Sequence, residues 1–309
     1  IADILMPALE KSFEGFNFFM AGFMVKEAHT PDELPLHQDW NILDETQYTS
    51  YQIWVPLDLS SAENGGMFVL PGSHRFFNNH RSGSFGIPVV PTNEVLRPLT
   101  ADMIVPPGSG LIFYNSLFHA SYPNRSSANR ISAIVSVYQK NARLNYYHKN
   151  TAQQCTDVYG ITSDIFLQSL NTLENKGTPI QPLSHTTTGL QTIENDKITA
   201  DDLVEGFRKY SGGDGKDFEP LQLHILRDES LEKKLKRDGY AVLDFLDEQT
   251  VAALKQEYID KFGTPNTAIG RFTPMEHSTP ASKREIHNFI LDKIRSQLDK
   301  VFKDYQIDR

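Results

Sequence analysis

Two side chains that could bind a metal ion stand two positions apart in Leu36-His37-Gln38-Asp39-Trp40. Alternate side chains of a β-strand lie on the same face, so His37 and Asp39 could point into one cavity. An imidazole and a carboxylate on one face are half of a site with two histidines and one carboxylate. That site leaves positions open on iron(II) for a cosubstrate and for O2. His-x-Asp is common by chance, and a histidine in a surface loop is the alternative for His37.

The third ligand must come from a distant strand, and His119 stands in a suitable place. It follows a predicted strand at residues 109–114 and precedes another at residues 131–138. A lone histidine at such a position is more often structural. Together with His37 and Asp39, it completes the predicted catalytic and metal-binding set.

Arg130 indicates which cosubstrate this site could take. The guanidinium stands at the head of the strand that follows His119, where it could bind a carboxylate through two hydrogen bonds. A dicarboxylate such as 2-oxoglutarate needs this contact at its far end while its 2-oxo acid end chelates iron. Ser121, two positions after His119, could donate its hydroxyl to the same carboxylate. An ion pair at the surface is the alternative for Arg130.

The composition is that of an ordinary globular protein and limits the possible partners. The 309 residues are 39% hydrophobic and 22% charged, enough for one large domain or two small ones. The net charge of −9 argues against nucleic acid or a membrane as partner, because both bind clusters of Lys and Arg. No apolar run approaches the length that spans a bilayer, and no signal peptide is expected. The single cysteine, Cys155, excludes an internal disulfide and favours a reducing, cytoplasmic location.

The first half of the chain is predicted to be mainly strands. Short apolar runs alternate with turn signals such as Asn64-Gly65-Gly66, a pattern that favours a sandwich or jelly roll. The predicted strands cover residues 16–26, 52–55, 67–70, 109–114 and 131–138. The last of these is predicted to pack on both faces, because its apolar and small residues alternate.

After residue 141 the pattern becomes helical. Asp247 is the predicted N-cap of one helix. A ten-residue repeat also emerges, because residues 298–307 match residues 9–18 with three identities. The remaining predictions are helices at 164–173, 230–238, 247–258 and 282–305, a strand at 240–245, a loop at 178–188 and a linker at 211–217.

These motifs resemble the phytanoyl-CoA dioxygenase family of iron(II)/2-oxoglutarate oxygenases. The similar blocks stand in family order with family-like spacing, within roughly residues 1–175. They are residues 34–40, 50–58, 64–67, 70–75 and 119–130. The resemblance implies a mainly β fold with flanking helices, a double-stranded β-helix of the jelly-roll, cupin-like type.

The resemblance also implies roles for single residues. The iron ligands, which are also the catalytic residues, would be His37, Asp39 and His119. The 2-oxoglutarate-binding residues would be Arg130, Ser121, Gln38 and Trp54. Related halogenases replace the carboxylate ligand with a small residue, so a carboxylate at Asp39 favours hydroxylation or another oxidation over halogenation.

Other residues near these motifs have less specific predictions. Lys26 could touch the cosubstrate but is expected in solvent, and His74 is expected to have a structural role in its turn. The loops predicted to select the substrate are residues 41–49, 76–107 and 145–149. The second of these loops, which contains Arg81, could cover a polar or an anionic substrate or be a solvated insertion.

The order of the segments differs from that of the family. Residues 219–309 resemble the family's N-terminal part, yet they follow the jelly-roll core and its tail at residues 1–218. A circular permutation and a piece of a tandem array both fit this order. We expect the two parts to pack together as one composite domain.

The sequence therefore predicts an iron(II)- and 2-oxoglutarate-dependent dioxygenase that hydroxylates a small molecule with O2 and releases succinate and CO2. One alternative is a metal-dependent cupin enzyme without 2-oxoglutarate, which would have no use for Arg130. The other is a metal-free jelly-roll binding module. Neither nucleic acid nor a membrane is expected as a partner, and a homo-oligomer stays open.

Overall fold

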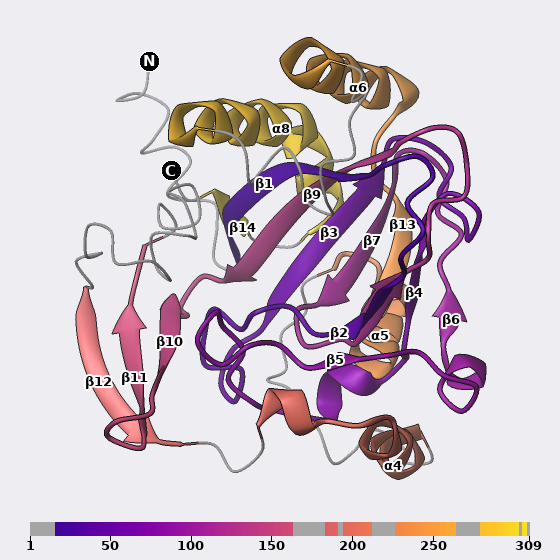
Figure 1. Ribbon diagram of the computed structural model, residues 1–309. Helices are drawn as coiled ribbons and strands as arrows, with labels where there is room; N and C mark the ends of the chain where they lie inside the picture. Colours follow the sequence, from indigo (N-terminus) through magenta and orange to yellow (C-terminus); the bar gives the residue numbers. More distant parts are fainter. Residues whose placement is uncertain are drawn as a thin grey trace.

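A computed structural model describes residues 16–162, 183–190, 194–211, 226–263, 279–302 and 305–307. The core of the described residues consists of two β-sheets (Figure 1). A cavity lies between the two sheets. The six-stranded sheet has the order β13 (Tyr240–Asp244), β7 (Ser109–Tyr114), β3 (Ser50–Pro56), β9 (Arg130–Gln139), β1 (Phe16–Lys26) and β14 (Tyr305–Ile307). The five-stranded sheet has the order β5 (Val89–Val90), β2 (Leu34–His37), β8 (His119–Ser121), β4 (Met67–Val69) and β6 (Ala101–Asp102).

The path of the chain between these sheets defines the fold. β1, β3, β7 and β9 lie in the larger sheet, and β2, β4, β6 and β8 in the smaller one, so the chain crosses from sheet to sheet. Eight antiparallel strands wound in this way form a jelly roll, or double-stranded β-helix. The predicted fold class is confirmed. β9 is buried along its whole length, as its alternating sequence predicts.

Helices from the second half of the chain cover the larger sheet. α6 (Glu248–Phe262) and α8 (Pro280–Val301) lie on its outer side (Figure 1). The apolar residues of α8 recur at helical spacing, and Ile286, Ile290 and Ile294 are buried in the same core cluster as the strands. Asp247 accepts a hydrogen bond from the backbone of Thr250 and is the N-cap of α6, as predicted. None of the helices in the described residues is long and apolar enough to cross a membrane.

Several predicted elements differ from the structure. The predicted loop at residues 178–188 is wrong for residues 184–188, which belong to β12 (Ser184–Gly189). The run of threonines suits a strand because β-branched side chains favour extended backbone. β12 extends a separate sheet with β11 (Cys155–Gly160) and β10 (Asn145–Asn150). The predicted helix at 164–173 and the linker beyond Ser211 lie outside the described residues.

The end of the last helix also differs from the prediction. α8 ends at Val301, and residues 305–307 form β14, which pairs in parallel with β1. Phe16 stands beside Tyr305, and residue 18 beside residue 307. These are the pairs of positions that the ten-residue repeat aligns. The division of the chain at residue 218, and its origin by permutation or tandem repetition, stay predictions.

The turn at residues 72–75 caps the C-terminal end of a helix from the second half of the chain. Residues 72–75 donate three hydrogen bonds to the last carbonyls of α5 (Glu229–Asp238). The bonds run from the Gly72 backbone to Asp238 (2.8 Å), from His74 Nε2 to Lys236 (3.2 Å) and from Arg75 Nη2 to Arg237 (3.3 Å). The last carbonyls of a helix have no partner within it, so these bonds hold α5 against the core.

His74 also packs closely in this turn. Its ring stacks on Tyr114 with centroids 4.6 Å apart. Gly239, which ends α5 with a φ of 85°, has room only for hydrogen on this side, because a Cβ there would lie 2.5 Å from His74 Nδ1. Burial lowers the pKa of His74 from 6.5 to about 3, and the Arg75 cation adds to the effect. The expected structural role of His74 agrees with these contacts.

The low pKa of His74 predicts acid sensitivity. Between pH 6.5 and about 3 the unfolded chain binds a proton that the folded chain excludes, so the free energy of unfolding falls as pH falls. We expect His74→Gln to reduce the slope of unfolding free energy against pH, near pH 5, by about 1.4 kcal/mol per pH unit, the value for one proton. Urea unfolding followed over this range measures the slope. His29→Asn, at an exposed histidine, is the control. Equal slopes for His74→Gln and the unaltered chain would contradict a neutral, buried His74.

Candidate metal centre

The two predicted histidine ligands face each other across β2 and β8. His37 pairs with His119 in the register of these strands, and their ring centroids are 4.3 Å apart. Each Nδ1 lies beside a carbonyl two residues earlier in the chain, at 2.8 Å for Pro35 and 3.0 Å for Leu117. A proton on Nδ1 satisfies each carbonyl and leaves the lone pair of each Nε2 for a metal ion, the usual outer contact of a histidine ligand.

Asp39 lies just beyond β2 and completes the set. Its Oδ1 is 3.9 Å from His119 Nε2. One ligand atom from each of His37, Asp39 and His119 lies within 4.8 Å of the others, so the three could hold one metal ion. The backbone N–H of Asp39 donates to the carbonyl of Asn115 at 3.0 Å, a single hydrogen bond outside the strand ladder.

The electrostatics of the site suit a cation. The pKa of His37 is lowered from 6.5 to about 4, first because burial penalises its charged form and then because His119 is close; Asp39 opposes the shift. His37 is therefore neutral near pH 7, which is the form that binds metals. Two imidazoles and one carboxylate are the donor set of an iron(II) oxygenase site.

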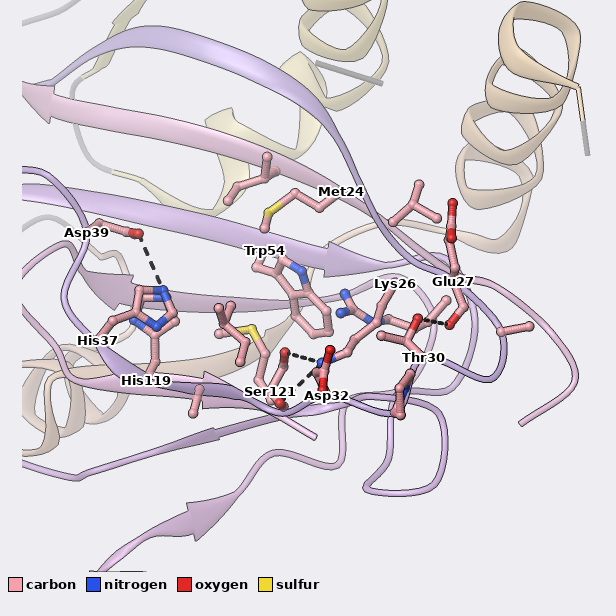
Figure 2. A pocket seen from close by; sticks show the side chains of 18 of the residues that line it. Met24, Lys26, Glu27, Thr30, Asp32, His37, Asp39, Trp54, His119 and Ser121 are labelled. Atoms are coloured by element: carbon pink, nitrogen blue, oxygen red, sulfur yellow. Dashed lines mark hydrogen bonds and ion pairs between the residues drawn. The ribbon is translucent and has the colours of Figure 1, made fainter. Parts of the chain in front are cut away.

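A cavity of about 340 Å³ extends from these three residues between the sheets (Figure 2). Apolar side chains form most of its wall, and Lys26 and Arg130 contribute two cationic groups. Residues 27–32 line it as well. The remaining wall includes Met24, Trp54, Met67, Phe113, Ala120 and Ile134.

Arg130 is a buried cation in this wall. Burial lowers its pKa from 12.5 to about 10. The guanidinium lies over the ring of Trp54, 5.1 Å from its centroid, and Nη1 donates to Ser132 Oγ at 3.2 Å. Its Nε has no hydrogen-bond partner among the described residues. Arg130 therefore lies in the cavity wall. Its predicted contact with a carboxylate of the cosubstrate stays a prediction.

Lys26 and Ser121 lie beside each other in the same wall. The ammonium of Lys26 is 2.9 Å from Ser121 Oγ and 3.3 Å from the Ser121 carbonyl (Figure 2). The expectation that Lys26 is solvated is wrong, because the residue is only 9% exposed. Lys26 pairs with Arg130 across β1 and β9. That pairing depends on a contact between distant strands, so local sequence does not reveal it.

Of the two other residues predicted to line the cosubstrate pocket, Trp54 lines the cavity and Gln38 does not. Trp54 lines the cavity beneath Arg130. The structure does not bring Gln38 there, because successive residues of an extended chain point to opposite sides. Gln38 is fully buried, and its amide donates to the carbonyl of Ser116 at 2.6 Å.

The three candidate ligands can be tested with Co(II), whose visible absorption reports its coordination. We expect His37→Ala or His119→Ala to lower Co(II) affinity by at least about 100-fold, because the loss of mere outer contacts of ligands typically costs about 10- to 100-fold. His185→Ala, whose side chain is 49% exposed on β12, is the matched control. Unchanged binding by His37→Ala would mean that the metal lies elsewhere.

Comparison with solved structures finds several partly similar proteins. EvdO2 from Micromonospora carbonacea var. aurantiaca is 21% identical, with a TM-score of 0.34 over 40% of this chain and 52% of that one. The epimerase SnoN, solved with Fe3+, alpha ketoglutarate and nogalamycin RO, is 16% identical, with a TM-score of 0.37 over 59% and 64%. The fold assignment rests on the strand order described above.

Comparison of sequences finds two relatives. A phytanoyl-CoA dioxygenase domain-containing protein 1 homolog of Dictyostelium discoideum is 26% identical over 148 residues, 45% of this chain and 53% of that protein. A probable alpha-ketoglutarate-dependent hypophosphite dioxygenase of Stutzerimonas stutzeri is 31% identical over 101 residues, 30% of this chain and 35% of that protein. The chain thus spans about half or less of these relatives. Residues 3–132 match the family model for phytanoyl-CoA dioxygenase (PhyH), and over these residues the resemblance predicted from the motifs is confirmed.

Proposed function

We propose that this chain is an iron(II)- and 2-oxoglutarate-dependent dioxygenase that hydroxylates a small-molecule substrate. The observation that carries the proposal is one cavity with two chemically different groups in its wall. His37, Asp39 and His119 form a candidate metal site, and Arg130 is a buried cation with an open hydrogen-bond donor. The relative from Stutzerimonas stutzeri, whose name includes alpha-ketoglutarate dependence, supports this reading.

The residues present fit the two groups that the proposal requires. His37, Asp39 and His119 would hold iron(II), which would supply O2 activation coupled to the oxidative decarboxylation of 2-oxoglutarate. Arg130 would bind the distal carboxylate of 2-oxoglutarate with its free Nε and its neighbouring nitrogens. The ring of Trp54 lies against the guanidinium and keeps water from that side.

Lys26 and Ser121 would complete the carboxylate site. If Lys26 donates to Ser121 Oγ, the hydroxyl proton of Ser121 is left to donate to the bound carboxylate. The ammonium also adds a second positive charge near Arg130. The distal carboxylate would offset part of the cost of burying these cations.

In this proposal, the carboxylate of Asp39 favours hydroxylation over halogenation. A carboxylate fills the third protein position on the metal, so no place is left there for a halide. We therefore propose hydroxylation, in a reducing cytoplasmic location where iron stays ferrous. The chain would act on a small molecule and not on nucleic acid or a membrane.

Arg130→Met tests the cosubstrate. We expect about a 100-fold weaker affinity for 2-oxoglutarate, because charge-assisted hydrogen bonds in a dry site contribute roughly 1.5–3 kcal/mol each. Anaerobic titration with Fe(II) and 2-oxoglutarate measures this through the visible charge-transfer band of the chelate. Arg125→Met, at an exposed arginine, is the matched control.

The outcomes of this titration separate the alternatives. Fe(II) binding by the unaltered chain without a band on addition of 2-oxoglutarate would favour a cupin enzyme that does not use this cosubstrate. No Fe(II) binding by the unaltered chain would favour a metal-free binding module.

Lys26→Met tests the second cation. We expect a loss of 2-oxoglutarate affinity of about 10-fold, smaller than for Arg130→Met, because lysine is a point charge without the planar fork of arginine. Ser121→Ala should show a loss of the same order, and the double variant should lose little more than either single variant. Fully additive losses would show that Lys26 does not act through Ser121.

A further inference from the structure

Arg81 is a fully buried cation that contacts the backbone of Asp39, the carboxylate ligand of the candidate metal site. Its side chain has no exposed surface. Nη2 lies 2.7 Å from both carboxylate oxygens of Glu45, which is 11% exposed. Neither solvation nor contact with a substrate, the two roles expected for Arg81 from the sequence, fits this burial.

The rest of the guanidinium is bonded to backbone. Its Nε donates to the carbonyl of Asp39 at 2.7 Å, and its Nη1 donates to the carbonyl of Asn79 at 3.0 Å. Two further bonds join the backbone of Arg81 to Asn41: its N–H donates to Asn41 Oδ1 at 2.6 Å, and its carbonyl accepts from the Asn41 N–H at 3.2 Å. Arg81 thus joins residues 39–45 to residues 79–81.

These bonds hold the backbone of Asp39 from two sides. Its N–H donates to Asn115, and its carbonyl accepts from Arg81. Asp39 lies beyond the end of β2, where no regular strand pairing restrains it. A metal ligand must be held to within about 0.5 Å, so a residue in this position needs added restraint.

We propose that Arg81, paired with Glu45, is the positioning residue of the Asp39 carboxylate ligand. The proposal rests on the proposed function only in that Asp39 binds the metal. A buried ion pair contributes little net stability, because its desolvation cost offsets its attraction. Its value here is orientation: the planar fork of arginine can bind Glu45 and the Asp39 carbonyl at the same time, and lysine cannot.

Co(II) binding to the full chain tests this role. We expect Arg81→Met to weaken Co(II) affinity by about 10- to 100-fold, as outer contacts of metal ligands do, and to change the visible spectrum of the bound ion. Arg81→Lys should recover part of the affinity, because an ammonium can reach one of the acceptors. Arg97→Met is the control: Arg97 belongs to the same loop, but its side chain is 37% exposed and pairs with Asp102.

A double-mutant cycle distinguishes positioning from general stability. In an Asp39→Ala background, Arg81→Met should change Co(II) affinity by less than about twofold, because the ligand on which Arg81 acts is gone. A merely structural Arg81 would repeat its full loss in that background and would overturn the proposal. If Arg81→Met does not fold, Glu45→Gln, which keeps the shape of the partner, takes its place in the same cycle.

The remaining outcomes separate this proposal from the proposed function. If the unaltered chain binds no Co(II), the metal site itself is wrong. If it binds Co(II), and both Arg81→Met and Glu45→Gln bind it equally with an unchanged spectrum, only the role of Arg81 is wrong.

Discussion

The pairing of β2 with β8 is the constraint on which the candidate site depends, because it sets His37 opposite His119. β2 has four residues and β8 has three, so few ladder bonds hold the register. Packing on the opposite face of these strands also fixes the register. The side chains of Leu36, Phe118 and Ala120 are fully buried there in one apolar cluster. A shift by one residue would bring Leu36 toward the cavity and a histidine into that cluster, so burial of the apolar face keeps both imidazoles directed inward.

The larger sheet forms the other wall of the cavity. Strands from both halves of the chain make up this sheet. β1 carries Lys26 and lies between β9 and β14. α8 packs on β1, where the backbone N–H of Ala21 donates to His287 Nδ1 at 3.0 Å. At the other edge, β13 pairs with β7, next to the turn that caps α5. The position of Lys26 therefore depends on residues more than 200 positions away in the sequence.

The sequence predicted those features that local pattern determines. Alternation and turn signals predicted the strands. The family motifs predicted that His37, Asp39 and His119 form one ligand set, and the three residues lie together in the structure. Features that depend on strand pairing were missed. Lys26 was expected in solvent because a lysine in isolation favours water, yet its place opposite Arg130 buries it. The ion pair of Arg81 was missed as well, because its carboxylate partner, Glu45, lies in a separate loop.

Arg81 and Arg130, two buried arginines among the described residues, differ in how the protein compensates their charge. Burying a guanidinium is costly unless an anion or several acceptors replace its water. Arg81 has such partners in Glu45 and in two backbone carbonyls, so its place is complete within the protein. Arg130 has one hydroxyl at Nη1, the face of Trp54 and an open Nε, and burial lowers its pKa. A bound carboxylate would supply at Arg130 what Glu45 supplies at Arg81, so the proposed anionic ligand is expected in the cavity and not in the loop that carries Arg81.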